Sequence, residues 1–314
     1  MDYRYLRDRM LVGFGVGALM LAAGSGIAAA EDEPAPNTGN FSVTFQNDFT
    51  TAYYFRGILQ ENDGGIWEPS LGLAWKLYSS EDGPLRSASI GLGTWESVHS
   101  THTLASGNGP KAWYEADVYP SVSMSWAGGV STGLTYYFYT SPNGGFSTTE
   151  EVDVSLGFDD SPYLDKFALH PSLTLAWEVK GTSFSDFHGN TCDGSGNACG
   201  HGTGSLAILA IAPSYALFSD SSYPLTLTLP VSVALSMDDY YKTDEHNETF
   251  GYAALGLTAN IPLAFIPKRY GTWSVTNGLN VLFLNDALED VNSTSLTGGP
   301  DVQPVWTSSI IMTY

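Results

Sequence analysis

Apolar and polar residues alternate along most of this chain, and this alternation constrains its fold more than any other feature. One example runs from Trp67 to Leu77 and another from Tyr114 to Trp126, each with an apolar residue at every second position. Because successive side chains of a strand point to opposite faces, such a segment predicts a β-strand with one apolar and one polar face. Repeated segments of about ten residues with this pattern are typical of transmembrane β-barrels.

The segments with this pattern predict about twelve strands. Their approximate ranges are 41–57, 66–78, 86–97, 112–126, 130–141, 149–158, 168–181, 204–218, 223–236, 249–261, 272–285 and 302–314. An even number is expected of a bacterial single-chain barrel. The predicted fold is therefore all-β, an antiparallel up-and-down transmembrane β-barrel.

The connections between the predicted strands differ in length at the two ends of the barrel. If the first strand runs outward, the outer connections hold every long polar segment, at 58–65, 98–111, 142–148, 182–203, 237–248 and 286–301. The inner connections are shorter on average, at 79–85, 127–129, 159–167, 219–222 and 262–271. Outer-membrane barrels have short periplasmic turns and longer external loops. The lengths therefore favour an outer-membrane barrel and indicate which end faces outward.

Prolines occur within or beside the predicted strands in a repeated context. Four x-Pro-Ser units followed by an apolar or aromatic residue contain Pro69, Pro120, Pro171 and Pro213. Proline cannot donate to a strand ladder and usually marks an edge or a bulge. Each unit therefore predicts a bulge or a local break in strand pairing.

The first thirty residues have the features of a secretory signal peptide. Three arginines precede an apolar stretch from Leu11 to Ile27, and an Ala28-Ala29-Ala30 sequence follows it. This order of basic, apolar and small residues predicts cleavage after Ala30. An uncleaved anchor helix is the alternative, although the Gly-rich stretch is short for a membrane span. We expect a signal peptide at 1–30, a periplasmic segment at 31–40 and the barrel at 41–314.

Tryptophans lie near the ends of the predicted strands, on the apolar face. They are Trp67, Trp75, Trp126, Trp177, Trp273 and Trp306. Amphipathic rings favour the boundary between lipid and water, so these residues predict aromatic girdles in contact with outer-membrane lipid and lipopolysaccharide. The alternative is a soluble secreted β-sandwich in which the tryptophans fill the core. That fold needs a second apolar face, whereas the opposite faces here carry Gly, Ser, Thr, Tyr and carboxylates.

Carboxylates outnumber bases on the faces predicted to line the interior. The residues assigned to the lumen and to its selectivity are Arg56, Glu68, Glu96, Glu115, Asp117, Glu151, Asp153 and Glu178, together with Lys76 and Lys180. A lumen of this composition should attract cations and exclude anions. Arg56 and Glu68 flank the first outer connection, which predicts a cross-strand ion pair between them. The alternative is that these groups pair with one another and plug the barrel.

A short motif in the first predicted strand resembles a known signature. Tyr53, Phe55, Arg56, Gly57 and Gln60 form the pattern Y-x-F-R-G-x-x-Q. This pattern resembles that of an uncharacterised family of bacterial outer-membrane proteins, the Gcw_chp-type conserved hypothetical barrels. The resemblance implies a signal peptide followed by a β-barrel, and it implies no active site.

Two cysteines lie close together in the longest predicted outer loop. Because an exported protein meets oxidising surroundings, Cys192 and Cys199 predict a disulfide that stabilises by about 2–3 kcal/mol. The alternative is a tetrahedral metal site that also uses His188 and His201. We expect the disulfide, and we predict no metal and no cofactor.

Charge and the absence of known catalytic motifs limit the possible functions. A chain with a net charge of −21 and no basic stripe is not expected to bind nucleic acid. It contains no G-x-S-x-G, H-E-x-x-H or phosphate-loop motif, so we predict that it is not an enzyme. The leading hypothesis is a narrow cation-favouring, porin-like channel for small solutes in the outer membrane. The alternatives are a structural or adhesive barrel whose external loops bind a partner and, less favoured, a surface hydrolase using His188.

Overall fold

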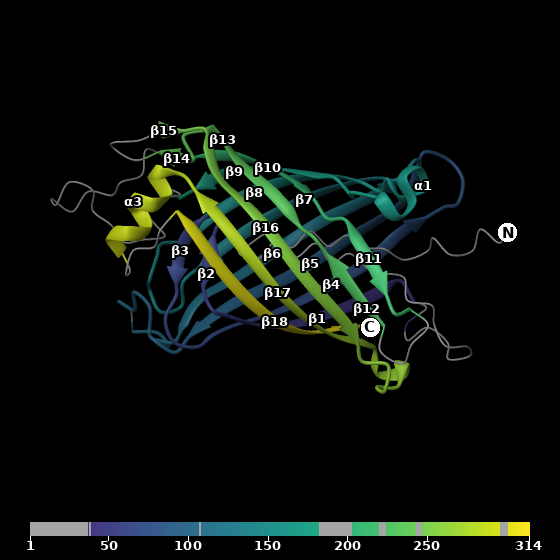
Figure 1. The fold of residues 1–314 in the computed structure, drawn as a ribbon, viewed down its shortest axis with the longest axis horizontal. Helices are drawn as coiled ribbons and strands as arrows, with labels where there is room; N and C mark the ends of the chain where they lie inside the picture. The colour runs from purple at the N-terminus through teal and green to yellow at the C-terminus, as the bar shows by residue number, and fades with distance from the viewer. Residues whose placement is uncertain are drawn as a thin grey trace.

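Twelve antiparallel strands form a closed ring in the computed structural model (Figure 1). The structure describes residues 37, 39–106, 108–181, 203–219, 224–242, 247–295 and 301–314. The strands of the ring are β1 (Phe41–Thr50), β4 (Ile66–Ser79), β5 (Leu85–His99), β6 (Trp113–Trp126), β7 (Val130–Thr140), β8 (Thr149–Phe158), β9 (Ser172–Lys180), β10 (Ser205–Ile211), β13 (Val231–Asp238), β16 (Phe250–Pro262), β17 (Thr272–Leu284) and β18 (Val302–Thr313). Neighbours in the chain are neighbours in the ring, and β1 pairs with β18 to close it. The predicted up-and-down barrel is confirmed, and the soluble sandwich is excluded.

Short elements lie at the two ends of the ring. They are β2 (Tyr53–Phe55), β3 (Ile58–Glu61), β11 (Ser214–Leu217), β12 (Leu225–Thr228), β14 (Tyr241–Lys242), β15 (Asn247–Glu248), α1 (Ser161–Leu164), α3 (Asp286–Ser295) and the 3-10 helices η1 (Asp165–Phe167) and η2 (Lys268–Tyr270). Among the described residues, no helix has the length and apolar character needed to cross a membrane. The end that carries β2, β3, β14, β15 and α3 is called the loop end, and the end that carries α1, β11 and β12 is called the turn end (Figure 1).

The two faces of the strands differ as the alternation predicts. On the outer face, Leu71 and Val122 are each 37% exposed, and similar apolar side chains surround the ring. On the inner face, Glu115 and Asp153 are buried. The predicted girdle residues share the outer face: Trp67, Trp75, Trp177 and Trp306 are exposed, and Trp126 and Trp273 are half-buried. An exposed apolar band of this extent on a closed barrel is the surface that a membrane-spanning barrel presents to lipid.

The first strand is shorter than the alternation predicts. It ends at Thr50 rather than at residue 57, and the chain then turns into the ring as the hairpin β2–β3. Phe55 pairs with Ile58, so Arg56 and Gly57 are the two residues of the turn, with φ values of 51° and 88°. Positive φ at both central residues is the mark of the tight type I′ turn, which the glycine accommodates easily.

Prolines interrupt pairing at the predicted units, although in different ways. Pro213 separates β10 from β11, and Pro171 immediately precedes β9. Pro69 and Pro120 lie within β4 and β6, where each pairs with a neighbouring strand on one side. Several predictions concern residues outside those that the structure describes, namely the signal peptide at 1–30 and the residues His188, Cys192, Cys199 and His201.

Candidate functional site

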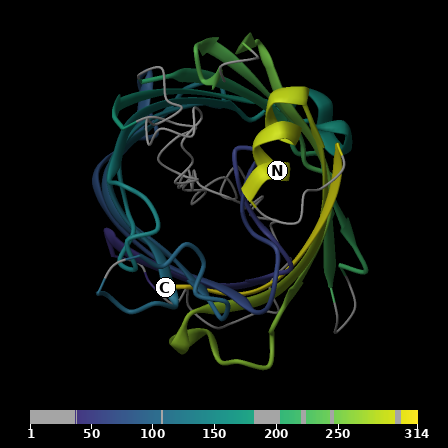
Figure 2. The same cartoon turned by 90° about the vertical axis from the view of Figure 1, so that its left-hand side faces the viewer.

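The hairpin β2–β3 lies inside the ring of strands near the loop end (Figure 2). One side of it, with Tyr54, Ile58 and Leu59, belongs to an apolar cluster that includes residues of β9, β10, β13, β16, β17 and β18. Its other side, with Tyr53 and Phe55, belongs to a second cluster with residues of β4 to β7. The hairpin therefore packs against opposite walls of the barrel, and we call residues 53–61 the hairpin plug.

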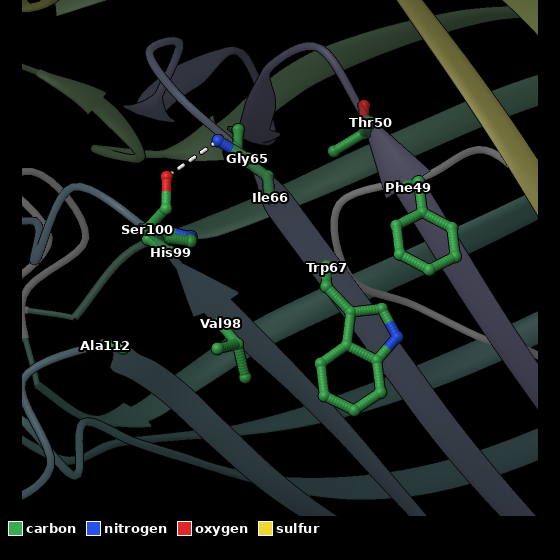
Figure 3. Close-up of a pocket in the computed structure, with 9 residues that line it drawn as sticks. All are labelled: Phe49, Thr50, Gly65, Ile66, Trp67, Val98, His99, Ser100 and Ala112. Atoms are coloured by element: carbon green, nitrogen blue, oxygen red, sulfur yellow. Dashed lines mark hydrogen bonds between the residues drawn. The ribbon is translucent and has the colours of Figure 1, made fainter.

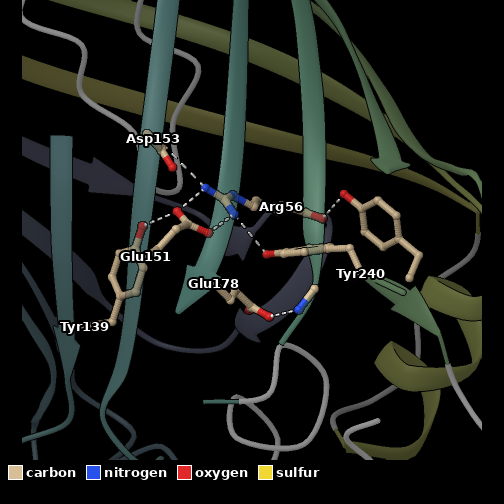
Figure 4. A network of polar contacts seen from close by, with 8 residues as sticks. Arg56, Tyr139, Glu151, Asp153, Glu178 and Tyr240 are labelled. Atoms are coloured by element: carbon tan, nitrogen blue, oxygen red, sulfur yellow. Dashed lines mark hydrogen bonds and ion pairs between the residues drawn. The ribbon is translucent and has the colours of Figure 1, made fainter. Parts of the chain in front are cut away.

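Arg56, at the tip of the hairpin plug, is bound by carboxylates of β8 (Figure 4). Its Nη1 and Nη2 donate to the two carboxylate oxygens of Glu151, the second bond being 2.5 Å long, and Asp153 Oδ2 lies 3.7 Å from Nη2. Tyr139 donates to Glu151 Oε1 at 2.9 Å. The rings of Phe55 and Tyr240 lie 5.1 and 5.5 Å from the guanidinium carbon. This bidentate, aromatic-lined geometry is specific for a guanidinium group.

Two further elements of the loop end hold the hairpin plug. Asn292 of α3 accepts a hydrogen bond from Leu59 N at 2.8 Å and donates to Gly57 O at 3.0 Å. Tyr241 of β14 donates to Arg56 O at 3.2 Å. The plug is therefore fixed by a wall strand, a loop strand and a loop helix together.

Carboxylates also gather on the part of the inner wall formed by β1, β4 and β6. Asp48 pairs with Glu68 across β1 and β4, and the β4–β5–β6 register then places Ser97 and Glu115 at the same level. Asp117 follows on the same face of β6. We call Asp48, Glu68, Glu115 and Asp117 the acidic wall, and all four side chains are buried.

The predicted lumen residues are mostly where the alternation places them. Glu68, Glu115, Asp117, Glu151, Asp153 and Glu178 are inward and buried. Glu178 accepts a hydrogen bond from Gly204 N at 2.7 Å. Arg56 is also in the interior, although it reaches there on the plug and not on a wall strand.

Several sequence-based predictions about this site are wrong. Lys180 does not line the interior, because its side chain is 59% exposed and bonds to Glu150 at 2.9 Å beside a register shift between β8 and β9. Glu96 shares the outer face of β5 with Ile90 and Leu92, because pairing runs without a register shift between them, and Trp95 and Ser97 face inward instead. The ion pair expected between Arg56 and Glu68 is also absent from the described residues, since Arg56 reaches Glu151 across the barrel.

The loop end of β5 carries a second polar network, beyond the level of Trp67. Glu61 accepts hydrogen bonds from Thr101 and Thr103 and from the backbone amides of residues 62 and 63. Burial alone would raise the pKa of Glu61, but these donors outweigh it and leave the pKa below its usual value. His99 lies between Ser97 and Thr103, and burial lowers the pKa of His99 to about 4. A neutral imidazole and an ionised carboxylate therefore anchor the loop after β5 at neutral pH.

An apolar groove of about 390 Å³ lies outside the ring, at the loop end of β1, β4 and β5 (Figure 3). Phe49, Trp67 and Val98 form much of its lining, and the hydrogen bond from Gly65 N to Ser100 Oγ, 2.8 Å long, closes its upper edge. Because these apolar side chains belong to the outer face, the groove is part of the exterior band and not of the interior.

Several interior residues were not found from the sequence. The sequence pattern assigns no interior role to Asp48, Tyr139 or Tyr240, and Tyr53 enters only through the Y-x-F-R-G-x-x-Q motif. All four side chains are buried. The Thr135-x-Tyr137-x-Tyr139 alternation could have indicated inward tyrosines. The alternation places Tyr114 on the outer face, but a register shift between β5 and β6 lies beside it and its side chain is turned inward. Its hydroxyl donates a hydrogen bond to Gln60 Oε1 at 2.5 Å.

Comparisons with known proteins give likenesses of fold only. Neither the family models nor the curated proteins include a match to this chain. Among solved structures, an outer membrane channel from Pseudomonas putida F1 is 12% identical, with a TM-score of 0.45 over 90% of this chain and 100% of that one. The NanC porin is 12% identical, with a TM-score of 0.41 over 86% and 98%. The translocator domain of the autotransporter NalP from Neisseria meningitidis is 13% identical, with a TM-score of 0.39 over 88% and 89%.

Proposed function

We propose that this protein is exported by its first thirty residues to the outer membrane and forms a narrow, cation-favouring passage for small solutes. The apolar exterior band supports residence in a membrane, since such a band on a soluble barrel would face water. The distribution of long loops and short turns supports the orientation with the loop end outside.

The observation that carries the proposal is the charge of the inner wall. Seven inward carboxylates lie on the strands, namely Asp48, Glu68, Glu115, Asp117, Glu151, Asp153 and Glu178. Arg56 supplies one positive charge beside Glu151 and Asp153. The excess of acidic over basic groups on this wall supports a preference for cations, because each carboxylate that is ionised lowers the barrier for cations and raises it for anions.

Reversal potentials across planar bilayers test this proposal. With a KCl gradient, we expect the folded protein to give a potential of the sign for cation selectivity, and Glu68→Gln to reduce it. Glu96→Gln is the matched control, because it removes the same charge from the outer face of the neighbouring strand. An anion-selective potential, or equal effects of the two variants, would contradict the proposal.

A closed structural barrel is the second candidate, and the hairpin plug favours it. The plug packs against both walls, and Ile58 and Leu59 at its centre are buried. The Arg56→Gln variant separates the two candidates, since it weakens the attachment of the plug. If neither the wild type nor the Arg56→Gln variant conducts ions, the result supports the closed structural barrel.

A further inference from the structure

The interior contains two similar pairs of carboxylates, of which one holds a guanidinium group and the other has no cation among the described residues. Glu151 and Asp153 on β8 form the first pair and bind Arg56. Glu115 and Asp117 on β6 form the second, with the same spacing of two residues and the same inward orientation. The sequences Glu-Ala-Asp and Glu-Val-Asp thus place the same two groups at two positions on the wall.

The surroundings of the two pairs correspond as well. In the first pair a tyrosine hydroxyl, that of Tyr139, donates to the glutamate. In the second pair Tyr53 of the hairpin plug donates to Glu115 Oε2 at 2.8 Å. Aromatic rings flank Arg56, and Trp95 lies directly across the strand pair from Asp117, 5.2 Å from the ring of Tyr53. An indole face is the best aromatic partner for a cation.

The second pair has buried oxygens without partners. Glu115 Oε1, both carboxylate oxygens of Asp117 and Glu68 Oε1 have no hydrogen bond, and these residues are 0%, 1% and 3% exposed. The backbone amide of Thr140 and the carboxyl group of Glu115 both lie near Asp117 but outside hydrogen-bond geometry. Carboxylates are acceptors only, so two of them satisfy each other only by sharing a proton. A cation with several N–H groups would supply donors to these oxygens, as Arg56 does for Glu151, although even there Asp153 Oδ1 is left without a hydrogen bond.

From these observations we propose that Glu115 and Asp117, with Glu68 beside them, bind the guanidinium group of a solute in the way that Glu151 and Asp153 bind Arg56. This inference rests on the proposed passage and names the class of solute it takes. The hairpin plug covers the site, because Tyr53 lies on Glu115, so a solute enters when the plug shifts. Arg56 then acts as a tethered occupant of the first pair, and the second pair receives the solute.

Binding of ethylguanidinium to the protein folded in detergent, followed by NMR saturation transfer, tests this proposal. Ethylurea, which has the same shape without the charge, is the control ligand. We expect ethylguanidinium to bind and ethylurea not to bind, Asp117→Asn to weaken binding at least ~10-fold, and Glu96→Gln to leave it unchanged. Heat-dependent electrophoretic mobility verifies that each variant is folded.

The Arg56→Gln variant provides a second part of the experiment. It loosens the hairpin plug and leaves Glu151 and Asp153 without their cation. We expect more ethylguanidinium to bind to this variant, and Asp117→Asn in the same background to remove part of that binding. Equal binding of ethylurea, binding independent of Asp117, or no binding to either background would overturn the proposal. Occupation of the site by Ca²⁺ in place of ethylguanidinium would also overturn it. A barrel that conducts cations without binding ethylguanidinium refutes this inference alone, whereas binding without conductance refutes the proposed passage.

Discussion

Removing the guanidinium of Arg56 should release the hairpin plug from the wall of the barrel. In Arg56→Gln the bidentate bonds to Glu151 are lost, and Glu151 and Asp153 remain buried without a cation. Breaking a buried ion pair by removing one partner costs about 3–5 kcal/mol. The plug keeps its hydrogen bonds to Asn292 and its apolar contacts, so we expect local opening rather than unfolding of the barrel.

The opening can be measured as thiol reactivity. In a background with Cys192 and Cys199 replaced by serine, Leu59→Cys places a thiol at a position that the plug buries. Since about 1.4 kcal/mol corresponds to a factor of ten, a loss of 3 kcal/mol should raise the rate of maleimide labelling by about 100-fold or more. Asn62→Cys, which is exposed beside the plug, should react at the same rate with either residue at position 56.

A second ion pair supplies the control for charge. Lys180 bonds to Glu150 at 2.9 Å on the exposed side of β8 and β9, and surface pairs contribute at most about 1 kcal/mol. Lys180→Gln should therefore change the labelling of Leu59→Cys by less than about fivefold. If Arg56→Gln behaves like Lys180→Gln, then the Arg56–Glu151 pair does not hold the plug, and our reasoning about the tip is refuted.

Three further predictions concern the turn, the exterior and the loop end. Gly57→Ala should loosen the plug by about 1–3 kcal/mol in the same labelling assay, because a Cβ there would lie 2.7 Å from Leu288 Cδ1 at a φ of +88°; unchanged labelling would contradict this. Leu134→Arg should destabilise the barrel by about 2–4 kcal/mol in urea unfolding from lipid bilayers, because Leu134 is exposed on the outer face near the middle of β7, and a neutral effect would mean that this face is not in lipid. His99 has a pKa of about 4 in the folded state, below the value of about 6.5 for an unfolded histidine. Between these two pH values the unfolded state binds more protons than the folded state, so stability is lost as the pH falls from about 6.5 to 4. His99→Gln should remove this part of the acid sensitivity of amide exchange in residues 100–106, and an identical pH profile would contradict the assignment.

The alternation predicted the barrel because each wall strand buries one face against the interior and exposes the other. That constraint is local, so the limits of β6, β7 and β8 can be read from the residues of each strand alone. It failed after Thr50, where Tyr53 and Phe55 continue the same period although the chain has left the wall. Gly57 was the available signal, because glycine adopts positive φ without steric cost and therefore permits a tight turn at this point.

The candidate site depended on contacts that a local pattern does not contain. Arg56 and Glu151 are 95 residues apart in the chain, and only closure of the barrel and inward folding of the hairpin bring them together. Glu96 was assigned to the interior from its charge, whereas the register of β5 follows Ile90 and Leu92 and turns it outward. Register is the stronger guide, since one residue of displacement moves a side chain to the other face.

Spin-label accessibility along β6 tests most directly whether the outer face contacts lipid and the acidic face lines the interior. Oxygen dissolved in the bilayer should accelerate the relaxation of spin labels at Val118, Val122 and Met124. It should have little effect on the relaxation of labels at Ser121 and Ser123. We expect accessibility to oxygen to alternate with a period of two residues in protein reconstituted into vesicles. Uniform accessibility, or greater accessibility to oxygen at Ser121 and Ser123, would contradict the membrane-spanning barrel on which every proposal here depends.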